Sequence, residues 1–240
     1  MFEIGGIYMK IEVWSDFACP FCYIGKTRFE KALNQFEHKD QVEVVYKAYQ
    51  LNPHAPKKMS ESAAETFAKG HGMSVEQAKQ RFEMFVANAK SEGLTYNYDI
   101  IQMTNSFDAH RLAKWANQFG LEPKVTTLLM KAYFTDGKNI SDINDLIKIA
   151  KEAGLDETKA KKVLESTDYA DQVNQEITEA RQVGVQGVPF FVINRKYGVS
   201  GAQATEYFLQ ALKQIYEEEK PIKKLNADES ASCNDNECGF

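Results

Sequence analysis

The feature that most constrains this chain is a pair of cysteines, Cys19 and Cys22, at the point where a strand pattern gives way to a helix pattern. Residues 10–15 have strand character, with Ile11 and Val13 on the same side of the predicted strand. Farther on, apolar side chains recur at the helical positions i, i+3, i+4 and i+7, which are Phe29, Ala32, Leu33 and Phe36. The cysteine pair is therefore predicted to lie where a helix begins.

This position favours redox chemistry at the two sulfurs. Free backbone N–H groups at a helix N-terminus stabilise the negative charge of a thiolate, which is the form that attacks a disulfide. Cys19 lies nearest the predicted helix start, so we expect it to be the exposed nucleophile. Cys22 lies one turn further in and is expected to resolve the mixed disulfide. Pro20 costs little here, because the N–H that it lacks would have no helical partner.

Two other interpretations of the cysteine pair are a zinc site and a pair of inert buried thiols. Structural zinc needs four ligands, usually as two pairs at short spacing. The other cysteines, Cys233 and Cys238, lie at the far end of the chain, and no histidine pair lies near either cysteine pair. The dithiol/disulfide interpretation is therefore favoured. It requires no metal and no organic cofactor, because the two thiols carry the electrons.

Composition and charge exclude several classes of partner. A formal charge of −5 over 240 residues offers no extended basic surface, so we expect no nucleic-acid partner. No apolar run approaches the roughly 18 residues that would cross a bilayer, so we expect no membrane association. The first residues lack the features of a secretory signal, and Met9 is a candidate start that would leave residues 1–8 as an extension. These features predict a cytoplasmic protein, in which a disulfide is more often catalytic or sensing than structural.

The order of patterns predicts an α/β protein with a large helical insertion. Strand character is seen at 10–15 and 42–49 and again at 190–193 and 197–200, where the last two segments suggest a hairpin. Helical periodicity dominates from about 61 to 183, and a last amphipathic helix contains Phe208. The predicted division is a split α/β domain at 9–52 and 184–217, a helical insertion at 53–183 and a tail at 218–240.

Three segments resemble DsbA-family thiol–disulfide oxidoreductases of the FrnE type. They are SDFACPFCYIG at 15–25, SFDAHRL at 106–112 and GVQGVPFFVINRKYGVSGAQ at 184–203. The resemblance implies a thioredoxin-like fold with a helical insertion, in which Pro189 is cis and packs beside the two cysteines. A cis bond there would let the backbone of Val188 pair with an extended substrate, presenting a substrate cysteine to Cys19.

Two other functions remain open on the same resemblance. The superfamily includes kappa-class glutathione transferases and 2-hydroxychromene-2-carboxylate isomerases, which carry serine at the position of Cys19. Because this chain retains both cysteines, a glutathione-dependent transferase or isomerase is the second choice. A redox or metal-stress sensor, in which oxidation or metal binding alters a partner surface, is the third.

Several residues around the motif have both a functional and a structural interpretation. Trp14 and Phe17 flank the motif and are expected to line an apolar groove for an unfolded or extended substrate. An equal alternative for Trp14 is a buried position in the strand. The resemblance places His110 and Arg111 towards the active-site face, where they would contact substrate or hold a thiolate, but a solvated pair capping a helix is the commoner case. Asp16 is either a helix cap or a proton acceptor for Cys22.

The tail contains a second cysteine pair, Cys233 and Cys238, in a polar segment without helical periodicity. About twelve residues of extended chain span up to about 40 Å, so contact with Cys19 is geometrically allowed. Because some FrnE-type members carry such a pair, we expect it to exchange electrons with Cys19 and Cys22. A metal-scavenging pair and incidental thiols are the alternatives.

The sequence thus predicts a cytoplasmic protein disulfide oxidoreductase or isomerase. Its expected partners are cysteine-containing proteins or peptides, and glutathione or a thioredoxin-type protein is the candidate reductant. The net direction depends on a reduction potential that sequence does not give.

Overall fold

The computed structural model describes residues 9–220. Within that range, four strands form one sheet in the order β2-β1-β3-β4. The central strand β1 (Met9–Ser15) runs parallel to β2 (Val42–Ala48), and its other neighbour, β3 (Phe190–Ile193), is antiparallel to it. The hairpin partner β4 (Tyr197–Ser200) forms the far edge. The parallel pair places the end of β1, and hence the cysteines, beside the end of β2.

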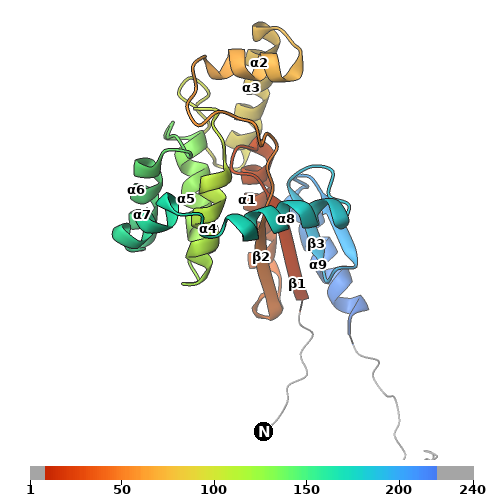
Figure 1. Cartoon of the computed structure of the whole chain (residues 1–240). Coiled ribbons are helices and arrows are strands. Elements are labelled where there is room, and N and C mark those ends of the chain that lie inside the picture. Colours follow the sequence, from red (N-terminus) through yellow and green to blue (C-terminus); the bar gives the residue numbers. More distant parts are fainter. Residues whose placement is uncertain (1–8, 221–240) are drawn as a thin grey trace, which may run out of the picture.

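Helices cover both faces of the sheet (Figure 1). On one face, α1 (Pro20–Gln35) and α9 (Thr205–Glu218) pack side by side, and Phe29 and Phe208 meet Phe191 of β3. On the other face lies α8 (Ala170–Gln182), where Ala180 packs with Trp14. A sheet covered on both faces buries nearly every residue of its central strand, which explains why β1 is buried at all positions except Lys10.

Along the sequence, the helices α2 to α7 come between β2 and α8. In Figure 1, α2 and α3 project beyond the start of α1 as an arm, and α4 to α7 form a bundle beside the sheet. Ser62 and Ser74 begin the two arm helices with reciprocal capping boxes, and Gly154 ends α6 in the left-handed conformation. The bounds are α2 (Ala63–His71), α3 (Val75–Ser91), α4 (Phe107–Asn117), α5 (Glu122–Phe134), α6 (Ile143–Ala153) and α7 (Glu157–Glu165), with a short 3₁₀ turn, η1 (Lys39–Gln41), before β2.

The predicted α/β fold with a helical insertion is confirmed. Both hairpin strands have the predicted bounds, and β2 ends one residue earlier, at Ala48. The division into domains stays a prediction, although α8, which it assigned to the insertion, packs against β2 in the sheet.

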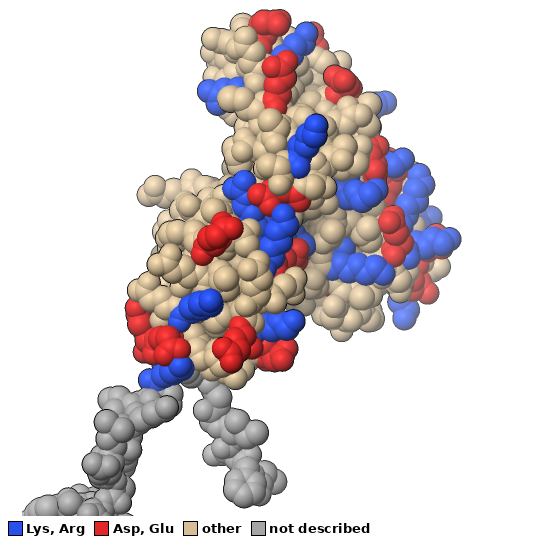
Figure 2. All heavy atoms as spheres, turned by 180° about the vertical axis from the view of Figure 1, so that it is seen from behind, with Lys and Arg blue, Asp and Glu red and all other residues tan. Residues whose placement is uncertain are grey.

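The surface opposite the view of Figure 1 carries charges of both signs. Lys and Arg side chains are interspersed there with Asp and Glu, without a large patch of one sign (Figure 2). In the part of the chain that the structure describes, no helix combines the length and the apolar character that a membrane crossing requires.

Candidate active site

Cys19 occupies the N-cap position of α1. Its backbone is extended, with φ −90° and ψ 118°, and Pro20 is the first helical residue. The carbonyl of Cys19 accepts a bond from the N–H of Cys22 at 3.0 Å, which brings the second cysteine round one turn. Our expectation of an exposed nucleophile was wrong in one respect, because only 4 % of Cys19 is exposed. Its side chain instead meets a cavity of about 680 Å³.

Cys22 lies behind Cys19 and is 1 % exposed. Its sulfur accepts a hydrogen bond from the N–H of Asp16 at 3.5 Å. Burial, and then the hydrogen bond and negative charge of Cys19, raise the pKa of Cys22 well above its ordinary value. Among the described residues, both cysteines are free thiols. The structure therefore shows two free thiols, one on a cavity wall and the other buried behind it.

Pro189 and Val188 form the wall next to Cys19. The bond between Val188 and Pro189 is cis, as the resemblance implied. The thiol of Cys19 lies 3.5 Å from the carbonyl oxygen of Val188. The proline ring packs so closely on α1 that a Cβ at Gly25 would lie 2.8 Å from Pro189 Cγ. Thus the absence of a side chain at Gly25 is what permits this approach.

Asp16 joins the loop before α1 to the loop after β2. Its Oδ1 accepts from the N–H of Ala18 at 3.2 Å, and its Oδ2 accepts from the N–H of Leu51 at 2.7 Å. Burial alone would raise the pKa of Asp16, but hydrogen bonding and the charge of His110 outweigh it and hold this pKa below its ordinary value. Asp16 does not cap α1, since the N-cap residue is Cys19. A role as proton acceptor for Cys22 stays a prediction.

His110 is buried behind the site rather than solvated. Its Nε2 lies 2.9 Å from the carbonyl oxygen of Tyr49 and 3.8 Å from Oδ1 of Asp16. Its ring packs on Phe17, with 4.5 Å between ring centroids. The burial of His110 contradicts the solvated cap, and His110 does not line the cavity where substrate contact was predicted. The residue instead supports Asp16. A role in holding a thiolate stays a prediction.

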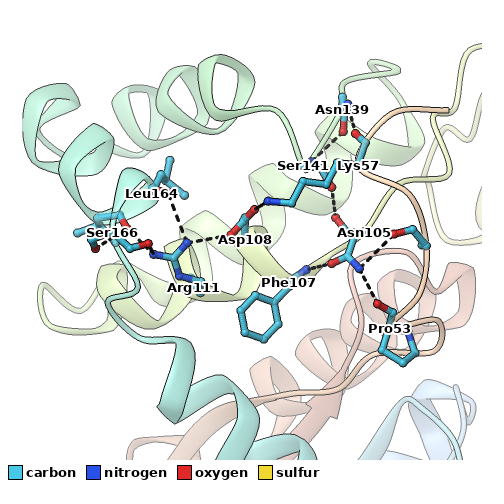
Figure 3. Close-up of polar contacts among 12 residues, drawn as sticks. Pro53, Lys57, Asn105, Phe107, Asp108, Arg111, Asn139, Ser141, Leu164 and Ser166 are labelled. Carbon is cyan, nitrogen blue, oxygen red and sulfur yellow. Dashed lines mark hydrogen bonds and ion pairs between the residues drawn. The ribbon is translucent and has the colours of Figure 1, made fainter.

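Arg111 has a structural role that the sequence did not indicate. Its guanidinium donates to the carbonyl oxygens of Asp168 at 2.8 Å and Ser166 at 2.6 Å, and to Oδ1 of Asp108 at 2.8 Å (Figure 3). Arg111 is buried and absent from the cavity lining. The prediction of substrate contact was therefore wrong, since this side chain ties α4 to the connection between α7 and α8.

Trp14 and Phe17 also lie outside the predicted groove. Trp14 is fully buried on the face covered by α8, where its Nε1–H donates to the carbonyl of Glu176 at 3.0 Å. Phe17 is buried in the main hydrophobic cluster. Neither residue lines the cavity. The alternative of a buried strand residue is confirmed for Trp14, because a strand covered on both faces leaves no exposed side for it.

Much of the cavity wall is aromatic, and sequence reasoning missed it. Phe21, between the two cysteines, is 41 % exposed and meets Phe85 of α3 edge-on at 5.4 Å. A large apolar residue between two cysteines at a helix start was the available signal. The other aromatic wall residues come from segments far along the chain and are Phe67, Tyr98, Tyr133 and Phe134. Arg81 and His71 add positive or titratable groups to the lining.

Within residues 9–220, no three His, Cys, Asp or Glu side chains gather closely enough to hold a metal ion. The tail pair, Cys233 and Cys238, lies outside the described residues, as does the predicted extension at 1–8. Electron exchange between the tail pair and Cys19 therefore stays a prediction.

Comparison with known proteins places this geometry in a family. The family model of the DSBA-like thioredoxin domain matches residues 10–213. The crystal structure of a probable DsbA oxidoreductase from Streptomyces coelicolor has a TM-score of 0.84 and 39 % identity, covering 97 % of this chain and 99 % of that one. The uncharacterized protein YwbO of Bacillus subtilis (strain 168) is 28 % identical over 207 residues, which are 85 % of this chain and 96 % of YwbO.

A more distant structure shares the fold alone. It is the cytosolic disulfide reductase DsbM from Pseudomonas aeruginosa, solved with GSH, at 13 % identity and a TM-score of 0.62, covering 87 % of this chain and 99 % of that one. The FrnE-type subgroup stays a prediction. From the match over residues 10–213 and the likeness to the Streptomyces structure, the chain belongs to the family of DSBA-like thioredoxin domains.

Proposed function

We propose that this protein is a thiol–disulfide oxidoreductase or isomerase that acts through Cys19 and Cys22. The observation that carries the proposal is the placement of Cys19 at a helix N-terminus, on a cavity wall, 3.5 Å from the carbonyl of Val188. The helix start stabilises a thiolate, and the cavity admits a disulfide to it. Family membership supports the same chemistry.

The exchange proceeds in two displacements. The Cys19 thiolate attacks a substrate disulfide, so that one sulfur–sulfur bond breaks, a Cys19–substrate disulfide forms and the other substrate sulfur leaves with the electron pair. Cys22 then loses its proton and attacks Cys19, which releases the second substrate sulfur as a thiolate. The substrate disulfide is reduced to two thiols, and the enzyme is oxidised to a Cys19–Cys22 disulfide. The reverse order oxidises a dithiol substrate.

The environment of Cys22 sets the order of these events. The pKa of Cys22 is raised first by burial and then by the hydrogen bond and charge of Cys19. Once Cys19 is joined to substrate, it carries no negative charge, so that part of the effect is lost while burial remains. Cys22 therefore becomes easier to deprotonate only after the mixed disulfide has formed. This dependence suits a resolving thiol.

The cavity supports an extended peptide or a small disulfide as substrate. Its volume of about 680 Å³ is far below that of a folded domain. The backbone of Val188 borders it, so we propose that a substrate strand pairs there as its cysteine approaches Cys19. We also propose that the protein is cytoplasmic. The structurally similar DsbM, a cytosolic disulfide reductase, supports this location.

A pair of cysteine variants tests the function. In an insulin-reduction assay with dithiothreitol as reductant, Cys19→Ser should lower the rate to the uncatalysed level. Cys22→Ser should instead accumulate a mixed disulfide between Cys19 and a substrate peptide, detected by mass spectrometry after acid quenching. Full activity in Cys19→Ser would rule out the proposed mechanism.

Glutathione is a second candidate partner, and the DsbM structure solved with GSH favours it. Arg81 and His71 on the lining would suit the carboxylates of such a tripeptide. A glutathione-dependent transferase or isomerase would retain activity in Cys22→Ser, because it needs a single sulfur site. A disulfide oxidoreductase that uses glutathione as reductant would lose turnover of protein disulfide substrates in the same variant. The two functions thus give opposite results.

A further inference from the structure

Tyr133 is a polar residue of the cavity to which the sequence and the family resemblance assign no role. It lies in the last turn of α5, and only 3 % of it is exposed, yet its side chain lines the cavity together with Cys19. Among residues 9–220, no hydrogen-bond partner is found for its hydroxyl, and only burial and nearby charges act on that group. Since Tyr133 lines the cavity, a molecule that enters it can accept a hydrogen bond from this hydroxyl.

The neighbouring tyrosines differ from Tyr133 in this respect. Tyr96 is also buried, but its hydroxyl donates to the carbonyl oxygen of Pro20 at 2.6 Å. Tyr98 lines the same cavity and is only half-buried, so solvent can satisfy its hydroxyl. Tyr133 is thus the more buried of the two tyrosines that line the cavity, and what enters the cavity can bond to its hydroxyl.

The charges near Tyr133 define what that partner can be. Burial, followed by the negative charges of Asp16 and Cys19, raises the pKa of Tyr133, so its phenol stays protonated at neutral pH. A phenol that stays protonated is a hydrogen-bond donor, and Tyr133 shares the lining of the cavity with Cys19. The Cys19 thiol lies instead 3.5 Å from the carbonyl oxygen of Val188. A donor near Cys19 but not bonded to it suits a second sulfur bound beside Cys19.

We propose that the Tyr133 hydroxyl donates a hydrogen bond to the substrate sulfur that leaves when Cys19 attacks. This inference rests on the proposed disulfide exchange and adds a catalytic group to it. As the substrate sulfur–sulfur bond breaks, the electron pair moves to the leaving sulfur, and the phenol stabilises that charge without giving up its proton. The bond strengthens as the charge develops, so it lowers the barrier rather than only improving binding.

Leaving-group dependence tests this role. Alkyl thiolates leave more slowly than aromatic thiolates, whose pKa is lower, and therefore gain more from a hydrogen bond. In a Cys22→Ser background, which isolates the first displacement, the rate of mixed-disulfide formation is measured with bis(2-hydroxyethyl) disulfide and with 5,5′-dithiobis(2-nitrobenzoate). Tyr133→Phe should slow the alkyl reaction on the order of 10–100-fold, the range for a bond to a charged group, and the aromatic reaction much less. For each disulfide, the rate of Tyr133→Phe is divided by the rate of the protein with Tyr133 intact, so that the different affinities of the two disulfides cancel.

Tyr23→Phe is the matched control. Tyr23 is a buried tyrosine of the same hydrophobic cluster, but it does not line the cavity, and it senses Lys131 and Glu30. This variant should leave both rates unchanged. Equal slowing of both substrates by Tyr133→Phe, or no slowing, would refute the assignment.

Alkylation of Cys19 by iodoacetamide involves no leaving thiolate from a substrate disulfide and should proceed at the wild-type rate in Tyr133→Phe. A similar decrease in the alkylation rate would show that the hydroxyl acts on the Cys19 thiolate before substrate binds, and it would also refute the assignment. If the protein with Tyr133 unchanged shows no exchange that depends on Cys19, the proposed function itself fails. That result is distinguishable from the others because it does not depend on Tyr133.

Discussion

A single methyl group at Gly25 should move the loop that carries Pro189. Gly25 is buried in α1, and a Cβ there would lie 2.8 Å from Pro189 Cγ and 3.3 Å from Cα of Ala202. Both contacts are closer than ordinary van der Waals distance, and neither neighbour is the end of a flexible side chain. In Gly25→Ala, the proline loop must therefore shift away from α1, and Val188 must shift with it relative to Cys19.

The magnitude follows from two opposing effects. Replacing glycine by alanine inside a helix stabilises it by roughly 1 kcal/mol. Forcing a methyl group into a packed contact costs about 1–3 kcal/mol. We therefore expect Gly25→Ala to lower the free energy of unfolding by about 0–2 kcal/mol. Exchange activity should fall on the order of tenfold or more, since misplacement of a substrate-docking segment by about 1 Å can cost about a hundredfold.

Gly70→Ala is the matched control for stability. Gly70 lies in α2, and a Cβ there would meet nothing within 4 Å. This variant should therefore gain about 1 kcal/mol. Urea denaturation of both variants measures the difference, which should be about 1–3 kcal/mol in favour of Gly70→Ala. Equal stabilisation of the two proteins, with wild-type insulin reduction by Gly25→Ala, would show that Gly25 does not fix the proline loop.

Two further predictions concern buried charges. Lys114 Nζ lies 2.7 Å from Glu122, 3.1 Å from Glu176 and 2.6 Å from the carbonyl of Tyr46. Lys114→Met leaves these buried groups without their cation, so urea denaturation should show a free energy of unfolding lower by about 3–5 kcal/mol, and a loss below about 1 kcal/mol would contradict this. Asp16 has a lowered pKa in the folded protein, so its ionised form stabilises the fold above its unfolded pKa of about 4, and this contribution is lost as the pH falls through the folded pKa. The stability advantage of wild type over Asp16→Asn should thus shrink below about pH 4, and a constant difference down to acid would refute the reasoning.

Local patterns predicted the position of the cysteine pair and the strands of the sheet well. The cysteine pair could be placed at a helix start because a change of period from strand to helix is visible within twenty or so residues. The β3–β4 hairpin could be bounded because the turn between its strands carries Asn194 and Arg195, both with positive φ in the structure. These features depend on neighbours in sequence, which is why they could be predicted from the sequence.

The surroundings of the site could not be predicted in the same way. In α4, every residue from Asp108 to Ala116 is buried. The sequence alone favoured a solvated face for its polar residues. In the structure, carbonyl groups of Tyr49 and of the α7–α8 connection are instead the hydrogen-bond partners of His110 and Arg111. Likewise, Tyr133 reaches the cavity only because α5 packs beside the start of α1. Such partners come from distant segments and leave no periodic signal.

The attachment of α8 has a consequence for cooperativity. The helical region leaves the sheet after β2 and returns to it through α8, where Glu176 accepts the indole N–H of Trp14 through its carbonyl and the N–H of Ala48 through its carboxylate. Lys114 of α4 joins the same carboxylate at 3.1 Å. Separating the bundle from the sheet would expose this buried ion pair and break the bonds to β1 and β2 together. The bundle and the sheet should therefore lose their structure in one transition, so the shape of the cavity between them depends on the stability of the whole molecule.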